Sequence, residues 1–168
     1  MIISIIYLTI SLVLEVIMSN FFSSTLSNTS FLSTIYTLIA LVVIYPYFNN
    51  DKKYFILIII FGILFNILYI GNIIFTMILF ITIGITIKVL YNIFPENIFM
   101  TNLISIIIIT IYHILSFIIL NIMSSIDYDF ILLINIIISS IIMTIIYTTI
   151  SYYIIKIIYN RFNIKQIK

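Results

Sequence analysis

Residues 54–94 read YFILIIIFGILFNILYIGNIIFTMILFITIGITIKVLYNIF, an apolar run whose one charged residue is Lys88. A helix needs ~20 apolar residues to cross the ~30 Å hydrocarbon core of a bilayer, so this run is long enough for two crossings. Gly71 and Asn72 interrupt it near the middle, and both residues tolerate the positive φ angles of a tight turn. The run therefore predicts a hairpin of two membrane-spanning helices, at residues 54–70 and 73–94.

Further apolar segments lie on both sides of this hairpin, at residues 2–22, 31–48, 98–122 and 130–158. The chain is 64% hydrophobic and 7% charged, which leaves no stretch for a soluble domain. The first segment lacks the basic start and the small-residue cleavage site of a signal peptide, so we expect it to be a retained span. Residues 1–168 are thus predicted to form one all-α integral membrane domain, a bundle of six transmembrane helices.

Charge distribution sets the expected orientation, because cytoplasmic loops carry the excess of Lys and Arg. With six spans, the seven basic residues all share a side with the N-terminus: Lys52, Lys53, Lys88, Lys156, Arg161, Lys165 and Lys168. If residues 54–94 crossed only once, the C-terminal basic residues would lie opposite Lys52 and Lys53. The pattern favours six spans with both termini in the cytoplasm.

Tyrosines gather near the predicted cytoplasmic ends of the helices, among them Tyr45, Tyr47, Tyr91, Tyr153 and Tyr159. Amphipathic rings at such positions commonly lie at headgroup depth, so we interpret them as membrane anchors. The basic residues at the C-terminus are expected to lie near anionic headgroups. Membrane lipids are therefore expected partners, and nucleic-acid binding is not supported.

Residues suited to soluble-enzyme chemistry are sparse. The chain has one histidine, three widely spaced glycines and no cysteine, so neither a polyhistidine metal site, a phosphate-binding loop nor a disulfide is encoded. A Ser-His-Asp arrangement would need His113 together with Asp127 or Asp129, and no nucleophile elbow accompanies them. We interpret the two aspartates as a solvated outer turn. We expect no catalytic, cofactor or metal site and no enzymatic activity.

Polar residues inside the predicted spans are the remaining candidates for function. Glu15 lies roughly 10 Å, and His113 roughly 14 Å, from the outer ends of their helices, so we hypothesise that they interact. Asn66 and Asn135 belong to the same half of the bilayer. These four residues indicate either interhelical hydrogen bonds or an outward-facing pocket or partner-binding seam, and we favour the hydrogen bonds.

The order of segments resembles the rod shape-determining MreD family of bacteria over essentially the whole chain. The resemblance is carried by LEVIMSN at 14–20, IYPYF at 44–48 and, most of all, FGILFNILY at 61–69, with a further match at Phe94-Pro95-Glu96-Asn97. Gly62, Tyr69 and Gly71 fit the family pattern of a glycine, an aromatic residue and a short turn into the next span. Asn66 stands where the family usually has an aspartate.

The resemblance implies a non-enzymatic scaffold subunit of the cell-elongation machinery in the bacterial plasma membrane. Such a subunit binds the bitopic protein MreC and so helps couple cytoplasmic MreB filaments to cell-wall synthases. The family's helical arrangement is similar to the S-component fold of energy-coupling-factor transporters, so the alternative is a vitamin-binding S component. We expect Gly62, Asn66, Tyr69 and Gly71 to form a structurally demanding hairpin whose polar side chain must be satisfied.

Overall fold

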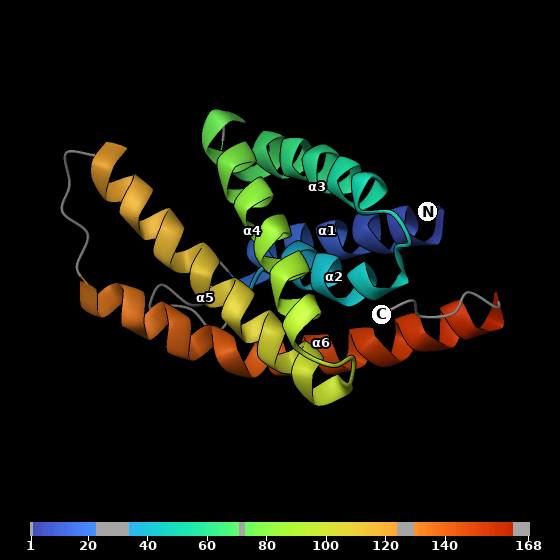
Figure 1. Ribbon diagram of the computed structural model, residues 1–168. Coiled ribbons are helices and arrows are strands. Elements are labelled where there is room, and N and C mark those ends of the chain that lie inside the picture. The colour runs from blue at the N-terminus through green and yellow to red at the C-terminus, as the bar shows by residue number, and fades with distance from the viewer. Residues whose placement is uncertain (1, 23–33, 71–72, 124–129, 163–168) are drawn as a thin grey trace.

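The computed structural model describes residues 2–22, 34–70, 73–123 and 130–162, and all regular structure within these ranges is helical. The elements are α1 (Ile2–Phe22), α2 (Tyr36–Ile44), η1 (Tyr45–Tyr47), α3 (Asp51–Phe65), η2 (Asn66–Ile70), α4 (Ile73–Ile93), α5 (Ile98–Met123) and α6 (Phe130–Arg161). Each apolar segment identified in the sequence corresponds to one of the helices α1 to α6 (Figure 1). The all-helical prediction is confirmed.

Four stretches of helix in the described ranges are long and apolar enough to cross a membrane: Ile2–Ser19, Ile73–Ile93, Ile98–Ile119 and Leu133–Arg161. The chain is therefore a multi-pass membrane protein. The second segment is shorter than predicted, because its helical part runs only from Tyr36 to Tyr47. The third begins earlier than predicted, at Asp51, and η2 continues it as a π-helical turn to Ile70.

Helix α2 lies at the centre of the bundle, and every side chain from Tyr36 to Ile44 is buried. It contacts α1, α5 and α6, and Figure 1 shows it between α1 and α6. A helix that is apolar on all sides is expected to be buried on all sides, and beyond Tyr36 and Thr37 at its start α2 carries only apolar side chains. Its Ala40 is the one alanine of the chain and is fully buried.

The outer helices bury several of their polar side chains. On α1 the side chains of Ser4, Ser11 and Glu15 are buried, whereas Ile6 and Ile10 are exposed. Lipid tails are as apolar as isoleucine, so burial of apolar surface does not hold such helices together, and hydroxyl and carboxyl contacts gain importance. The exposed isoleucine surface is what a bilayer would solvate.

Helices α3 and α4 form the hairpin predicted from residues 54–94, and their glycines permit a close approach. A Cβ atom at Gly62 would lie 3.2 Å from Cγ of Phe80, and one at Gly84 would collide with Cδ1 of Ile58. Each helix thus places a bulky side chain against the glycine of its neighbour, as small residues allow in membrane bundles. The predicted turn at Gly71 and Asn72 lies outside the described residues.

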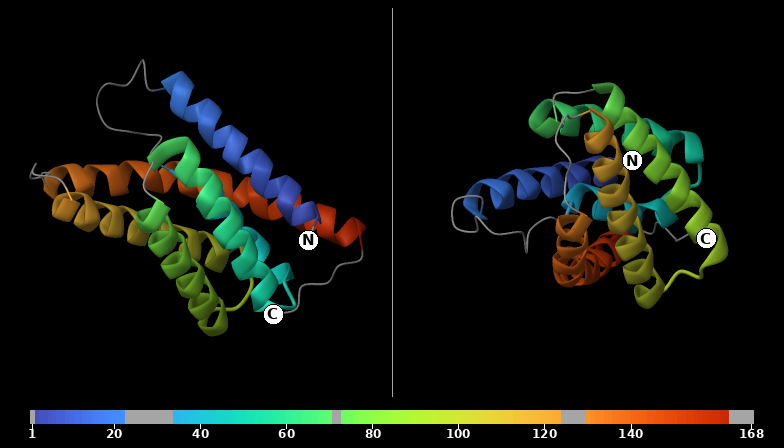
Figure 2. Two further views of the ribbon diagram at one scale, coloured as in Figure 1. Left: turned by 90° about the horizontal axis from the view of Figure 1, so that it is seen from above. Right: turned by 90° about the vertical axis from the view of Figure 1, so that its left-hand side faces the viewer.

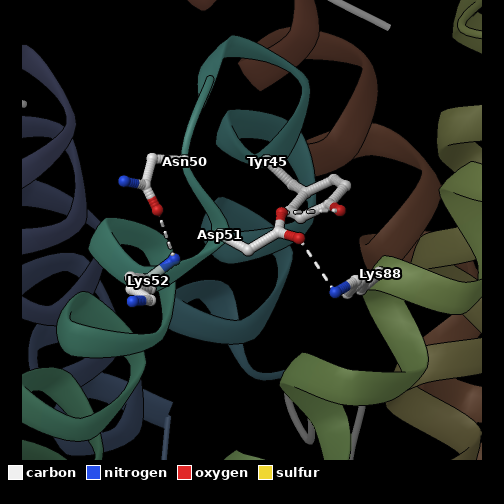
Figure 3. Close-up of polar contacts among 5 residues, drawn as sticks. All are labelled: Tyr45, Asn50, Asp51, Lys52 and Lys88. Carbon is white, nitrogen blue, oxygen red and sulfur yellow. Dashed lines mark hydrogen bonds and ion pairs between the residues drawn. The ribbon is translucent and has the colours of Figure 1, made fainter.

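The basic end of the hairpin is tied by charged and polar groups (Figure 3). Lys88 Nζ on α4 lies 2.8 Å from Asp51 Oδ2 at the start of α3. The hydroxyl of Tyr45 donates a hydrogen bond to Asp51 Oδ1, and Asn50 Oδ1 accepts one from the backbone N–H of Lys52. Asn50 thereby caps α3 in the manner typical of asparagine. The first turn of α3 and the last turns of α4 therefore meet at one end of the molecule.

Tyrosine rings at this end face the interior rather than the surface. Tyr45 packs against Tyr54 and Tyr91, and the ring centroids of Tyr47 and Tyr159 are 4.1 Å apart. All five rings are buried. The interpretation of Tyr45, Tyr47, Tyr91 and Tyr159 as headgroup anchors is therefore wrong. Together with Tyr54 these rings form aromatic contacts that join the ends of α2, α3, α4 and α6. Tyr153 is 54% exposed and remains suited to an anchoring role.

Candidate functional site

Glu15 is buried in the bundle, where it hydrogen-bonds to the central helix. Its Oε2 accepts a 2.6 Å hydrogen bond from Thr37 Oγ1 and a 3.1 Å hydrogen bond from the Thr37 backbone N–H. Thr37 is the second residue of α2, and the N-cap residue Ile35 has no side-chain cap of its own. Sequence reasoning did not identify Thr37 as the partner.

The contact solves a problem created by burying the start of a helix. The first N–H groups of an α-helix lack partners within the helix, and an unsatisfied backbone group away from water costs several kcal/mol. A carboxyl group is also favoured there by the partial positive charge of the helix N-terminus. Glu15 therefore acts as an N-cap supplied by a different helix, which explains why an acidic residue lies within a membrane helix.

Hydroxyl groups of α6 complete the surroundings of this helix start. Thr34 Oγ1, just before α2, donates a 3.0 Å hydrogen bond to the carbonyl of Ser140 and lies 3.5 Å from Thr144 Oγ1. Ser140 and Thr144 begin a buried stripe that continues through Thr148 and Ser151. Spacings of four, four and three residues along a helix place these hydroxyls on one face, a signal that the sequence contained and that our reading missed.

Two further hydroxyl pairs join α1 to α6. Ser4 Oγ lies 2.6 Å from the Tyr159 hydroxyl, and Ser11 Oγ lies 2.8 Å from the Tyr147 hydroxyl. Ser4 and Ser11 are seven residues apart, so they share the face of α1 that also carries Glu15. The polar face of α1 is thus used along most of its length to hold the helix against α2 and α6.

His113 and Asn135, which belong to the predicted polar layer, lie on α5 and α6. His113 is partly buried on α5, with its ring 5.7 Å from the Tyr112 ring. Asn135 is exposed on α6, so it does not belong to the buried contacts around α2. The proposed interaction of Glu15 with His113 stays a prediction, as does any role of Asn135 in partner binding.

Asn66 has a buried side chain in the α3–α4 hairpin. Its Oδ1 accepts a 3.1 Å hydrogen bond from Thr76 Oγ1, across the turn between the two helices. The expectation that this polar side chain must be satisfied is confirmed, and the partner is the first hydroxyl residue of α4. Gly62, which lies four residues before Asn66, packs against Phe80. The side chain of Tyr69 and all of Gly71 lie outside the described parts of the chain.

An apolar cavity of about 620 Å³ opens between α1 and α6. Ile6, Ile10 and Leu14 line it from α1, and Ile150 and Ile154 line it from α6. Tyr7, Tyr147 and Ser151 contribute the hydroxyl-bearing side chains of the lining. Neither Glu15 nor Asn66 contributes to this lining, so the polar contacts and the cavity are separate features.

Together these features define a multi-pass helical membrane protein whose intramembrane polar groups connect its own helices. Glu15 accepts hydrogen bonds from Thr37, and Asn66 accepts one from Thr76, so both side chains bond to another helix of the bundle. No protein-family model, curated protein or solved structure matches the chain.

Proposed function

We propose that the chain is a non-enzymatic scaffold subunit of the bacterial cell-elongation machinery, which binds an MreC-like bitopic protein through its transmembrane helices. The proposal rests on the resemblance of residues 14–20, 44–48 and 61–69 to the MreD family. It places the chain in the plasma membrane, linked through its partner to MreB-like filaments and cell-wall synthases.

The structural observation that supports a scaffold over a transporter or an enzyme is that Glu15 caps another helix of the same bundle. An acidic group inside a membrane helix is ordinarily a candidate for transport or catalysis. Here its two hydrogen bonds go to Thr37, at the start of the central helix. A carboxyl group that holds two helices together supports a role in which the bundle is a fixed structure and partners bind to its outer surface.

We further propose that the chain crosses the membrane six times, with both termini cytoplasmic and with a bundle of the S-component type. Contacts at one end of the molecule support this topology. Ser4 at the start of α1 meets Tyr159 near the end of α6, and Asp51 at the start of α3 meets Lys88 near the end of α4. The described basic residues of α3, α4 and α6 thereby gather at one end, as the positive-inside rule expects of a cytoplasmic face.

Helix α2 is the demanding part of this topology. Its apolar helical stretch Tyr36–Tyr47 corresponds to roughly 18 Å, which is less than the ~30 Å hydrocarbon core. The short helix is compatible with a crossing because protein surrounds it, and backbone at membrane depth is tolerated where it is buried in protein. Glu15 at its N-terminus supplies the polar partner that such burial requires.

The test is to purify the tagged chain in mild detergent from its native membrane and identify co-purifying proteins by mass spectrometry. Scaffold function predicts a single-span protein with a coiled coil outside the cytoplasm, together with elongation-machinery components. A control variant, Ala40→Leu in the buried central helix, should lose these partners along with the fold. Recovery of paired ATPases with a larger membrane coupler would contradict the proposal and make the chain a transporter subunit.

A further inference from the structure

The cavity between α1 and α6 is a groove open at the surface of the bundle. Its walls include Ile6 and Ile10 of α1 and Ile150 and Ile154 of α6, and all four side chains are also exposed. Tyr147, one of the lining residues, also hydrogen-bonds to Ser11 and so joins the two helices. A space of this kind, apolar and accessible from the side of the bundle, faces the hydrocarbon of a bilayer.

The groove is shorter than the hydrocarbon core of a bilayer is thick. Its lining extends along α1 from Ile3 to Leu14, which at the rise of an α-helix is roughly 16 Å. On the other side it extends from Tyr147 of α6 to Phe162, just past the end of that helix, which is roughly 22 Å. Because a ~30 Å core exceeds both lengths, a groove that begins at the basic end of the molecule does not reach the opposite membrane surface.

A cation lies next in sequence to Phe162, which lines the groove at the basic end of the molecule. Arg161 lies in the last turn of α6 and is exposed. It follows Ile158 by three residues and Ile154 by seven, so it lies on the face of α6 that lines the groove. The neighbouring first turn of α1 carries no acidic residue. The charge at this end is thus complementary to an anionic headgroup.

We propose that the α1–α6 groove binds one acyl chain of an anionic phospholipid, with its headgroup phosphate against Arg161. The length decides against a partner's transmembrane helix, which would span the whole ~30 Å core, whereas the groove covers only roughly 16 to 22 Å. The headgroup lies in the leaflet at the basic end of the molecule, where cytoplasmic membranes carry their anionic lipids. This lipid site rests on the proposed topology but not on the scaffold function.

The chain contains no tryptophan, so an introduced one becomes a single fluorescent reporter. Ile154→Trp places it in the groove, and Tyr153→Trp is the control at nearly the same depth on a residue that does not line the groove. Each variant is reconstituted in phosphatidylcholine vesicles that contain a minor fraction of dibrominated phosphatidylglycerol or, separately, of dibrominated phosphatidylcholine. Bromine atoms on the acyl chain quench tryptophan only at close range.

We expect the Ile154→Trp variant to prefer the anionic quencher by about fivefold, which is what one Arg near an anionic surface supplies. The Tyr153→Trp variant should respond equally to both quenchers, and adding Arg161→Gln to Ile154→Trp should remove the preference. Equal quenching of Ile154→Trp by both lipids would overturn the proposal. Absence of quenching by either lipid would mean that a second copy of the chain closes the groove, which would also overturn it.

A tryptophan at position 154 could itself fill the groove, so a second measurement uses the unsubstituted side chain. Native mass spectrometry of the wild-type chain with added phosphatidylglycerol should show one retained lipid that survives detergent removal. The Arg161→Gln variant should retain it several-fold less, while phosphatidylcholine should not be retained by either protein. Equal retention by wild type and Arg161→Gln would exclude a headgroup site at Arg161.

Discussion

Glu15 shows how a single side chain can be costly for a membrane helix and necessary for a bundle. A charge at the centre of a bilayer costs about 2.5 to 3.5 kcal/mol on insertion scales. In the assembled bundle, Glu15 Oε2 accepts hydrogen bonds from the backbone N–H and the hydroxyl of Thr37. Without Glu15, this N–H at the start of a buried helix would lose that partner. The residue is thus explained by what it satisfies on another helix.

Replacing Glu15 should therefore matter through its hydrogen bonds. We expect Glu15→Leu to lower stability in detergent by about 1 to 3 kcal/mol, because it leaves the Thr37 N–H buried without a partner. Glu15→Gln should retain most of the stability, because its amide oxygen can accept the same hydrogen bonds. Thermal unfolding of the three proteins measures the difference.

Double-mutant cycles then separate the two candidate partners of Glu15. Glu15→Leu combined with Thr37→Val should show coupling, because both changes remove parts of one contact. The same cycle with His113→Gln tests the interaction predicted from matched depth. If Thr37→Val is strictly additive with Glu15→Leu, the hydrogen bond between the Thr37 hydroxyl and Glu15 does not contribute to stability.

Gly84 offers a second prediction for a single residue. A Cβ atom added there meets Cδ1 of Ile58, which is fully buried. We expect Gly84→Ala to destabilise the bundle by about 1 to 3 kcal/mol through overpacking. Ile58→Val removes that Cδ1 atom, so the double variant should be more stable than the sum of the two single changes predicts. Thermal unfolding in detergent provides the values, and additivity would show that the two residues do not meet.

At the scale of elements, α2 differs from the other helices in having no outward face. All nine of its residues are buried, and it is enclosed by α1, α5 and α6. The outer helices need only one inward face, so their exposed isoleucines can vary without loss of packing. In α2 every position touches protein, and its small Ala40 sets how closely the neighbours approach.

Enlarging Ala40 should consequently disturb the bundle more than enlarging an outward-facing residue. We expect Ala40→Leu to destabilise by about 1 to 3 kcal/mol or to prevent folding. Val13→Leu on α1 is the matched control, because Val13 is 49% exposed and its enlargement should be almost neutral. Folded yield and size-exclusion profiles in detergent distinguish the two. Equal behaviour of both variants would contradict the central position of α2.

The hairpin of α3 and α4 contains a hydrogen bond that an aspartate in place of Asn66 could also make. Thr76 Oγ1 donates to Asn66 Oδ1, an oxygen that an aspartate would also provide. We expect Asn66→Asp to be tolerated and Asn66→Leu to cost about 1 kcal/mol, because Thr76 then loses its acceptor. Thermal unfolding tests both, and the Thr76→Val background should abolish the difference between wild type and Asn66→Leu.

At the scale of the whole molecule, contacts between helix ends gather charge on one side. The Asp51–Lys88 ion pair, the Ser4–Tyr159 hydrogen bond and the Tyr47–Tyr159 ring contact bring the ends of five helices together. An exposed ion pair of this kind contributes little to stability. Its significance is positional, because it places Lys88 beside the start of α3, which carries Lys52 and Lys53.

Accessibility to membrane-impermeant thiol reagents tests the proposed topology, since the chain has no cysteine of its own. Single substitutions Asn50→Cys and Asn97→Cys lie between helices at the basic end, and Ser19→Cys and Phe130→Cys lie at the other end. We expect the first pair to be labelled only from the cytoplasmic side and the second pair only from outside. Labelling of Asn50→Cys and Asn97→Cys from opposite sides would rule out six crossings.

The sequence by itself determined where the helices lie and that several of them suit a membrane. The length and composition of an apolar run are local properties, so the bounds of α1, α4 and α5 follow from reading the chain. The Asn66 side chain was likewise expected to need a partner, because an amide inside an apolar helix has few alternatives. The stripe from Ser140 to Ser151 was also readable as a helical spacing of hydroxyls.

Only the tertiary structure decided which groups meet and which helix lies inside. Depth in the membrane suggested His113 for Glu15, which stays a prediction, because helix length and hydropathy do not say which faces are adjacent. The hydrogen bonds of Glu15 to Thr37 appear only in the packed bundle, on a helix too short to be placed by length. Burial of Tyr45, Tyr91 and Tyr159 likewise depends on the packing of four helix ends. Such contacts join residues far apart in the chain, and no local pattern in the sequence specifies them.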